Sequence, residues 1–222
     1  GAVRLVLEDA GVGDWVLVAH SDGAPISRLF AERSPRRVIG LVSVDGALQY
    51  AFDGPEQINA LVRQMIDPVS GTEAANQLVN ALVPSIRNRA LSDAQNRLLR
   101  SDLRRRFLET PRGTLVQTLR MIAPPNQWPQ NTLIVPVLAV HAPNPLWDEA
   151  YVKTLRSIAP RVEVESWEDV GHYVMIDDPE RFNERLIRFI RSVVPADSTD
   201  EPDAGAGATD LPGTGEPADD RD

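Results

Sequence analysis

The stretch from Trp15 to Gly23, WVLVAHSDG, constrains the fold of this chain more than any other part of it. Residues 15–19 are apolar and rich in aromatic and β-branched types without polar alternation, which predicts a strand buried on both faces in a parallel sheet. Helical spacing of apolar residues begins a few positions later, and Pro25 suits a first helical turn. The backbone must therefore reverse sharply over residues 20–23.

Ser21 stands at the centre of this reversal, between two small residues. Ala19 and Gly23 lie two positions before and two positions after it, where we expect the backbone to be most crowded. The pattern matches the G-x-S-x-G nucleophile elbow, with alanine in place of the first glycine. It predicts a nucleophilic serine; an ordinary turn with Ser21 as the helix N-cap is the alternative. Asp22 is a poorer nucleophile candidate, because the bulky His20 would then occupy a position that needs a small residue.

A second strand is predicted at 37–44, RVIGLVSV, and it ends on Asp45. The interval after Ser21 leaves room for one crossover helix, so the two strands are expected to be parallel neighbours in a βαβ unit. Asp45 then follows the carboxyl end of its strand, at the edge where parallel sheets build their sites. Aspartates at such positions commonly cap a loop or a helix, but the proximity to Ser21 makes Asp45 a candidate catalytic residue.

Residues 47–131 show helical patterns without strands. An insertion between two strands of one sheet is predicted to form a cap over the strand ends, which would shape a pocket and exclude water. One cap helix is expected at about Ala94–Leu108, and acidic residues among its arginines favour a solvated face over a nucleic-acid site. Its predicted apolar stripe is Leu98, Leu99, Leu103 and Phe107, and its arginines off that stripe are Arg97, Arg100, Arg104 and Arg105.

His172 lies in a loop after the last predicted strand, directly behind Gly171. A loop histidine is commonly a surface residue, but this one shares a sheet edge with Ser21 and is therefore the candidate base. A capping residue and a proline at Asp178–Pro179 predict the start of a final helix. Further strands are expected at 132–141 and 161–165, with a helix near Trp147–Ile158 between them.

The chain resembles the later part of the α/β-hydrolase fold over about residues 1–194, in the segments VLVAHSDGAP, RVIGLVSVDGA, VPVLAVHAP and VGHYVMIDDPERFNERLIRFI. The elbow and the Gly-His loop are the specific parts of this resemblance. By position, Ser21 matches the nucleophile of the family and His172 its general base, and the order of serine, acid and histidine agrees. The resemblance implies a mostly parallel sheet with flanking helices and an inserted helical cap.

The position of the acid departs from the commonest family pattern. Many members carry it in a loop after the next-to-last strand, where this chain has Asn144. An asparagine can orient a histidine but does not stabilise its charge, and in the serine-protease template that exchange costs about 10⁴ in rate. Other members place the acid after the strand that follows the nucleophile helix, which is Asp45 here. Asp45 is therefore the predicted acid, with Asp148 as the alternative.

The resemblance also implies parts that would precede Gly1. The early strands of the family and its His-Gly loop have no counterpart here, so the N–H of Asp22 is the one oxyanion donor expected; losing one donor costs about 10²–10³ in turnover. The strand at 15–19 would leave an open apolar edge, and the missing N-terminal half or another chain is expected to stabilise it. We expect that the chain is cut at its N-terminus, so a signal peptide would be invisible and the cytoplasm is only the default location.

A complete protein of this kind is expected to be a serine hydrolase that cleaves a small carboxylic ester, lactone or thioester without a cofactor. A serine at the elbow disfavours the epoxide- and haloalkane-cleaving relatives, which use aspartate there. Asn144 and the absent oxyanion loop support a competing prediction: a catalytically impaired, hydrolase-like protein that binds a ligand or partner, or an inactive fragment.

The sequence divides into hydrolase core at 1–46, cap at 47–131, further core at 132–195 and an acidic tail at 196–222. The tail holds nine acidic residues and one arginine, so it accounts for most of the net charge of −9, and its composition predicts disorder.

A hydrophobic content of 42% suits a sizeable core. No run reaches the roughly 18 apolar residues of a membrane span. Cysteine is absent, and the three histidines lack metal-ligand spacing, so no metal site is expected.

Overall fold

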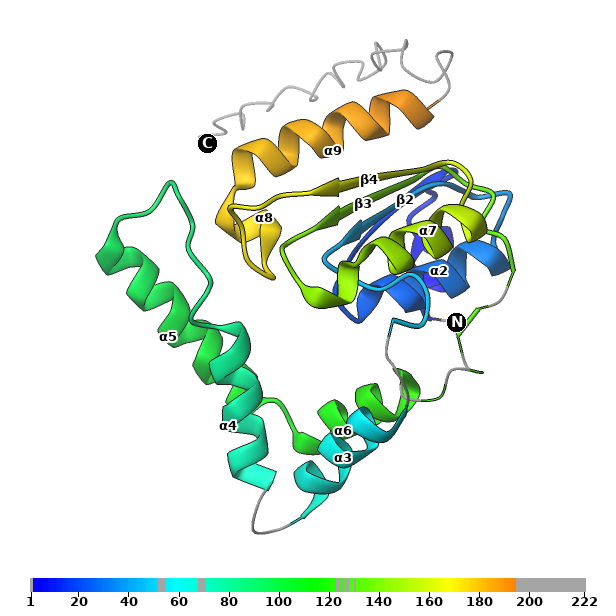
Figure 1. Ribbon diagram of the computed structural model, residues 1–222. Coiled ribbons are helices and arrows are strands. Elements are labelled where there is room, and N and C mark those ends of the chain that lie inside the picture. Colours follow the sequence, from blue (N-terminus) through cyan, green and yellow to red (C-terminus); the bar gives the residue numbers. More distant parts are fainter. Residues whose placement is uncertain are drawn as a thin grey trace, which may run out of the picture.

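The structure, a computed structural model, describes residues 2–51, 55–67, 71–122, 124, 126, 128–129 and 131–194. Its centre is a sheet of four parallel strands in the order β1-β2-β3-β4. Because the strands are parallel, all four end at the same edge of the sheet (Figure 1). β1 is an outer strand, as predicted. The strands are β1 Trp15–His20, β2 Val38–Val44, β3 Val137–His141 and β4 Val162–Ser166.

Helices cover both faces of this sheet (Figure 1). Helix α9 (Pro179–Val193) lies on one face, and α2 (Gly23–Arg33) and α7 (Glu149–Ile158) lie on the other. Neighbouring residues of β2 enter opposite cores: Leu41 packs with α2 and α7, and Val42 packs with α9. This double burial explains why the inner strands β2 and β3 read as apolar runs. The prediction that the strand at 15–19 is buried on both faces is wrong at Val18, which is 48% exposed on the outer strand β1. The predicted α/β fold class is confirmed.

Four helices stand between β2 and β3 and form a group apart from the layers of the sheet (Figure 1). Among the described residues of 47–131 there is no strand. The group touches the core beside the short helix α8 (Val174–Asp177), where Tyr173 and Ile176 pack against Phe107 and the end of α4. The four are α3 Pro55–Ile66, α4 Gly71–Leu82, α5 Asp93–Glu109 and α6 Arg112–Ile122; α1 (Ala2–Asp9) precedes β1.

The strand predicted at 132–141 is shorter in the structure and begins at Val137. Pro136 has no N–H to donate to a ladder, and Leu133 donates its N–H to the carbonyl of Ile158 at 2.7 Å instead of to a strand. The helix expected near Trp147–Ile158 also begins later than predicted, because α7 starts at Glu149. A 3-10 turn, η2 (Pro145–Trp147), precedes α7.

The apolar stripe predicted on α5 is wrong at Leu98, whose side chain is 71% exposed. The other three stripe residues pack toward α4. Two of the arginines also face the protein instead of solvent: Arg100 donates to the carbonyl of Ile86, and Arg104 donates to asparagine side chains of α4. Two of the arginines that the sequence analysis places on a solvated face therefore hold the helix against α4 and the segment after it.

The acidic tail predicted to be disordered, 196–222, lies outside the described residues. Within the part of the chain that the structure describes, no helix combines the length and the apolar character that crossing a membrane requires.

Candidate active site

The predicted reversal of the backbone at Ser21 is present between the end of β1 and the start of α2. Ser21 has a φ of +53°, a left-handed conformation that is uncommon for a serine. Its N–H donates to the carbonyl of Val44 at 3.0 Å, and its own carbonyl accepts from the N–H of Ala24 at 3.0 Å. These bonds tie the strained residue to the neighbouring strand and to the helix that follows. A strained strand-to-helix turn of this kind is the backbone of a nucleophile elbow.

The tightest packing around the elbow is not at Gly23, where the sequence pattern placed it. A Cβ atom on Gly23 would lie 3.6 Å from that of Ala19, an ordinary contact. A Cβ atom on Gly46 would lie 2.5 Å from the carbonyl oxygen of Ser21 and 2.7 Å from the Cβ of Ala24. The elbow therefore requires a glycine just after the adjacent strand β2, at a position that the local motif does not include.

His172 lies between Ser21 and Asp45 and is bonded to both. Its Nδ1 is 2.7 Å from Oδ2 of Asp45, and its Nε2 is 3.1 Å from Oγ of Ser21. A carboxylate can only accept, so Nδ1 donates to it, and in the neutral imidazole Nε2 is then the acceptor of the serine proton. Ser21 follows β1, Asp45 follows β2 and His172 follows β4. The structure thus brings these three predicted residues together at one edge of the sheet.

The carboxylate of Asp45 is buried and has three donors. Oδ1 accepts from the N–H of Ala142 at 3.0 Å and from the indole N–H of Trp147 at 2.8 Å, while Oδ2 accepts from His172. The residue is only 4% exposed. Full hydrogen bonding is what a buried carboxylate needs to remain charged. It also fixes the orientation of the oxygen that faces His172.

Asn144 and Asp148, the two alternative positions for the acid, are used as helix caps. The side chain of Asn144 accepts from the N–H of Leu146 at 3.0 Å and begins η2. The carboxylate of Asp148 accepts from the N–H of Tyr151 at 2.7 Å and begins α7. Neither forms a hydrogen bond with His172, so the structure favours Asp45 for the contact with the imidazole.

Two further histidines support this arrangement as neutral groups. His20 donates its Nε2 proton to the carbonyl of His172 at 2.8 Å, and burial lowers the pKa of His20. His141 stacks on Trp147 with ring centroids 4.5 Å apart, and burial lowers its pKa to about 4. One histidine therefore holds the backbone of His172, and the other holds the indole that binds Asp45.

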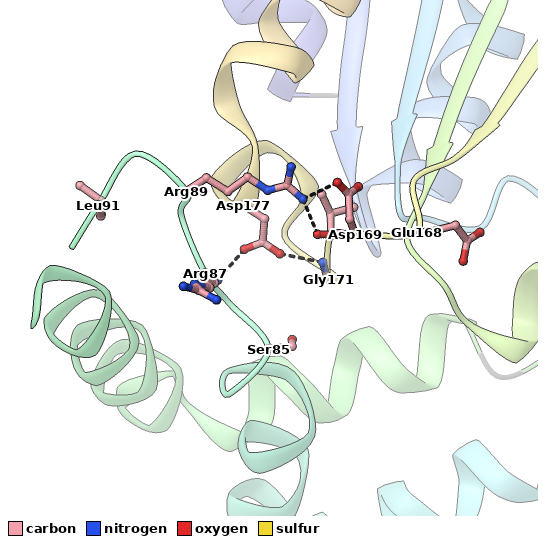
Figure 2. Close-up of a pocket in the computed structure, with 9 residues that line it drawn as sticks. Ser85, Arg87, Arg89, Leu91, Glu168, Asp169, Gly171 and Asp177 are labelled. Atoms are coloured by element: carbon pink, nitrogen blue, oxygen red, sulfur yellow. Dashed lines mark hydrogen bonds and ion pairs between the residues drawn. The ribbon is translucent and has the colours of Figure 1, made fainter. Parts of the chain in front are cut away.

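The loop that carries His172 is anchored to the segment between α4 and α5 by Asp177, a carboxylate that is 3% exposed. Its Oδ2 accepts from the N–H of Gly171 at 2.7 Å and its Oδ1 accepts from the N–H of Arg87 at 2.7 Å. Figure 2 shows Asp177 between these two groups, at a cavity of about 520 Å³ where Arg89 also reaches Asp169. A movement of the segment that contains Arg87 would therefore displace Asp177 and, through it, Gly171, the residue before His172. Nothing in the sequence pattern identified Asp177.

Two cavities meet at Ser21. The larger, of about 410 Å³, lies between Ser21 and helices α4, α5 and α6, and the smaller, of about 160 Å³, extends toward Asp45 and Trp147. Asp22 lines both of them. It is the N-cap residue of α2, yet its side chain makes no capping hydrogen bond. The apolar residues that helices α4, α5 and α6 contribute to the larger cavity are Leu78, Leu82, Phe107, Leu115 and Leu119.

No cluster of ligand side chains suited to a metal ion occurs among the described residues. What the site provides is an acceptor imidazole, a hydroxyl within its reach, and a buried carboxylate behind it. That set of groups fits nucleophilic attack by the hydroxyl with proton transfer to the imidazole.

Solved structures with the same fold include several hydrolases. An esterase from Thermogutta terrifontis is 18% identical, with a TM-score of 0.64 over 85% of this chain and 69% of that one. An esterase from Exiguobacterium antarcticum is 13% identical, with a TM-score of 0.66 over 86% and 71%. A mutant epoxide hydrolase from Bacillus megaterium is 16% identical, with a TM-score of 0.62 over 85% and 73%. At these identities the likeness concerns the fold alone.

No curated protein matches the sequence. The model of a protein family described as the alpha/beta hydrolase family does match it, over residues 2–185, which is most of the chain. The match includes the elbow at Ser21, Asp45 and the Gly-His loop. This chain therefore belongs to the alpha/beta hydrolase family.

Proposed function

We propose that this protein is a serine hydrolase that cleaves a carboxylic ester, lactone or thioester through an acyl-enzyme intermediate. The observation that carries the proposal is the continuous chain of hydrogen bonds from Asp45 through His172 to Ser21. Its two distances, 2.7 Å and 3.1 Å, are within the range for a carboxylate, a base and a nucleophile acting together.

The reaction proceeds in two halves. Oγ of Ser21 attacks the carbonyl carbon of the substrate while Nε2 of His172 takes the hydroxyl proton, and the imidazolium then gives that proton to the leaving group. Asp45 holds the imidazole by its Nδ1 proton and stabilises the positive charge that forms. Water, activated by the same imidazole, finally attacks the acyl group and releases Ser21.

The negative charge that develops on the carbonyl oxygen needs donors. The backbone N–H of Asp22, directly after the nucleophile, is the donor we assign within this chain, because this position supplies one of the two donors in nucleophile elbows. It stands at the start of α2, where the partial positive charge of the helix also favours an anion.

The alternative chemistry of the fold, epoxide opening, needs a carboxylate nucleophile at the elbow. Here the residue in the turn between β1 and α2, whose hydroxyl lies 3.1 Å from Nε2 of the imidazole, is Ser21. Asp22 follows it and has no hydrogen bond with His172. The serine chemistry is therefore the better account of this site.

A fluorophosphonate probe tests the proposal, since such probes react with serines activated by a neighbouring base. The purified protein should be labelled at Ser21, the Ser21→Ala variant should not, and hydrolysis of a short-chain para-nitrophenyl ester should follow the labelling. A folded protein that takes up no probe and hydrolyses no ester would instead be a hydrolase-like binding protein.

A further inference from the structure

Asp22 is an acidic residue at the junction of the two cavities, and its side chain is not committed to the catalytic relay. In the larger cavity it is the one carboxylate among the described lining residues, which include four leucines and a phenylalanine. In the smaller cavity the other carboxylate is Asp45, which is already bound by three donors. Asp22 therefore presents the free negative charge of this site.

No arginine, lysine or helix-cap contact within the described residues neutralises this carboxylate. The salt bridges of the structure do not include it, and it accepts no hydrogen bond from α2, although it stands at the N-cap position of that helix. Burial raises the pKa of Asp22, and the charge of His172 acts against that rise. The side chain of Asp22 is still reached by solvent and has no cation beside it, so a cation entering the cavity would gain by pairing with it.

The position of this charge also affects the reaction. The N–H of Asp22 is the assigned donor to the oxyanion of the transition state. The side-chain carboxylate of the same residue therefore lies close to that oxyanion. Two negative charges this close together repel each other. A positive charge on the substrate next to Asp22 would remove that repulsion, and a negative one would add to it.

We propose that Asp22 determines the charge preference of this site, and that its preferred substrates are esters with an apolar body and a positively charged ammonium group. The apolar body would occupy the cavity lined by Leu78, Leu115 and Leu119, and the ammonium group would lie against Asp22. This inference rests on the proposed serine hydrolase function and specifies its substrate class.

Two esters of nearly equal shape test it: the para-nitrophenyl ester of a trimethylammonio-butyrate and that of its neutral tert-butyl isostere. For the unmodified protein, kcat/KM should be about tenfold higher for the cationic ester, as expected for one close charge pair in a partly solvated site. Asp22→Asn should bring the ratio to about one, and Asp22→Glu should retain the preference for the cation.

Asp14→Asn is the matched control, because it removes the same charge from an exposed loop away from the cavities and should leave the ratio unchanged. If both esters are hydrolysed but the ratio is the same in the unmodified protein and in Asp22→Asn, the substrate inference is overturned while the serine hydrolase proposal stands. If neither ester is hydrolysed and the fluorophosphonate probe labels nothing in folded protein, both are overturned.

Discussion

The indole N–H of Trp147 donates to Oδ1 of Asp45 at 2.8 Å, while the other carboxylate oxygen of Asp45 binds His172. Trp147 lies in the turn η2 after β3, in the segment where the family resemblance suggests a position for the acid. The loop that has Asn144 instead of a carboxylate thus supplies a donor that positions a carboxylate from another strand. We therefore infer that Trp147 is a positioning residue that acts through Asp45.

Trp147→Phe keeps the ring in the cavity and removes the donor. Hydrogen bonds to charged groups are worth about 1.5–3 kcal/mol, so we expect kcat to fall about tenfold with little change in KM. Steady-state kinetics on a neutral ester measure both quantities. In an Asp45→Asn background the same change should have no further effect, whereas a purely structural role of Trp147 would reduce activity equally in both backgrounds.

Replacement of each candidate acid by its amide distinguishes Asp45 from Asp148. Asp45→Asn should lower ester turnover by about 10³–10⁴, as loss of the charge does in the serine-protease template. Asp148→Asn should have little effect, because asparagine caps a helix about as well as aspartate does. Comparable small losses in the two variants would mean that another group holds His172.

Gly46→Ala should destabilise the protein through the elbow, since the new methyl group meets the backbone of Ser21 at 2.5 Å. Overpacking of this kind typically costs about 1–3 kcal/mol, and here it also displaces the nucleophile. We expect a lower urea midpoint and slower labelling of Ser21 by the fluorophosphonate probe.

Gly23→Ala is the control for that variant, because its methyl group has room beside Ala19. It lies in the first turn of α2, where alanine is favoured over glycine by up to about 1 kcal/mol. Its stability should be unchanged or slightly higher. A larger loss of stability in Gly23→Ala than in Gly46→Ala would mean that the crowded position is Gly23, as the sequence motif suggested.

The features that sequence reasoning found are those that a short segment encodes by itself. The reversal at Ser21 follows from an apolar run, small residues and a proline within about a dozen positions, and parallel strands necessarily place Asp45 and His172 at the same edge. What it missed depends on contacts between distant segments. Gly46 is crowded because β2 lies beside the elbow, and Trp147 reaches Asp45 from a separate loop.

The error on α5 has a similar origin. Spacing places Leu98 beside Leu99, but it does not show how wide the packed face of the helix is. Nor does it show that Arg100 and Arg104 find partners in α4 and in the segment that follows it. A helical period identifies a face, and only the neighbouring helices determine its limits.

Asp177→Asn should loosen the connection between the cap and the loop of His172. An amide can accept from only one of the two N–H groups that Asp177 now binds, at Gly171 and Arg87. We expect kcat/KM to fall about tenfold, in line with the loss of a charge-assisted hydrogen bond. Amide hydrogen exchange should rise together in residues 85–91 and 168–173.

Asp169→Asn removes a neighbouring carboxylate that pairs with Arg89 and Arg181 at the surface. Exposed ion pairs contribute little, so exchange in both segments and kcat/KM should stay close to those of the unmodified protein. If Asp169→Asn and Asp177→Asn behave alike, the buried bonds of Asp177 are not what couples the cap to the loop.

His141 makes stability depend on pH. Burial lowers its pKa from an ordinary value of 6.5 to about 4, so the unfolded chain takes up a proton at a higher pH than the folded protein does. The stabilisation from a neutral His141 is therefore complete above pH 6.5 and is lost progressively as the pH falls toward 4, by about 2 kcal/mol between pH 6.5 and 5. Urea unfolding across this range measures the loss.

His141→Phe keeps a ring against Trp147 but cannot titrate. The difference in stability between the two proteins therefore separates the contribution of His141 from those of the other titratable groups. Equal slopes of stability against pH in the two proteins would show that the folded state accepts the proton on His141 without penalty.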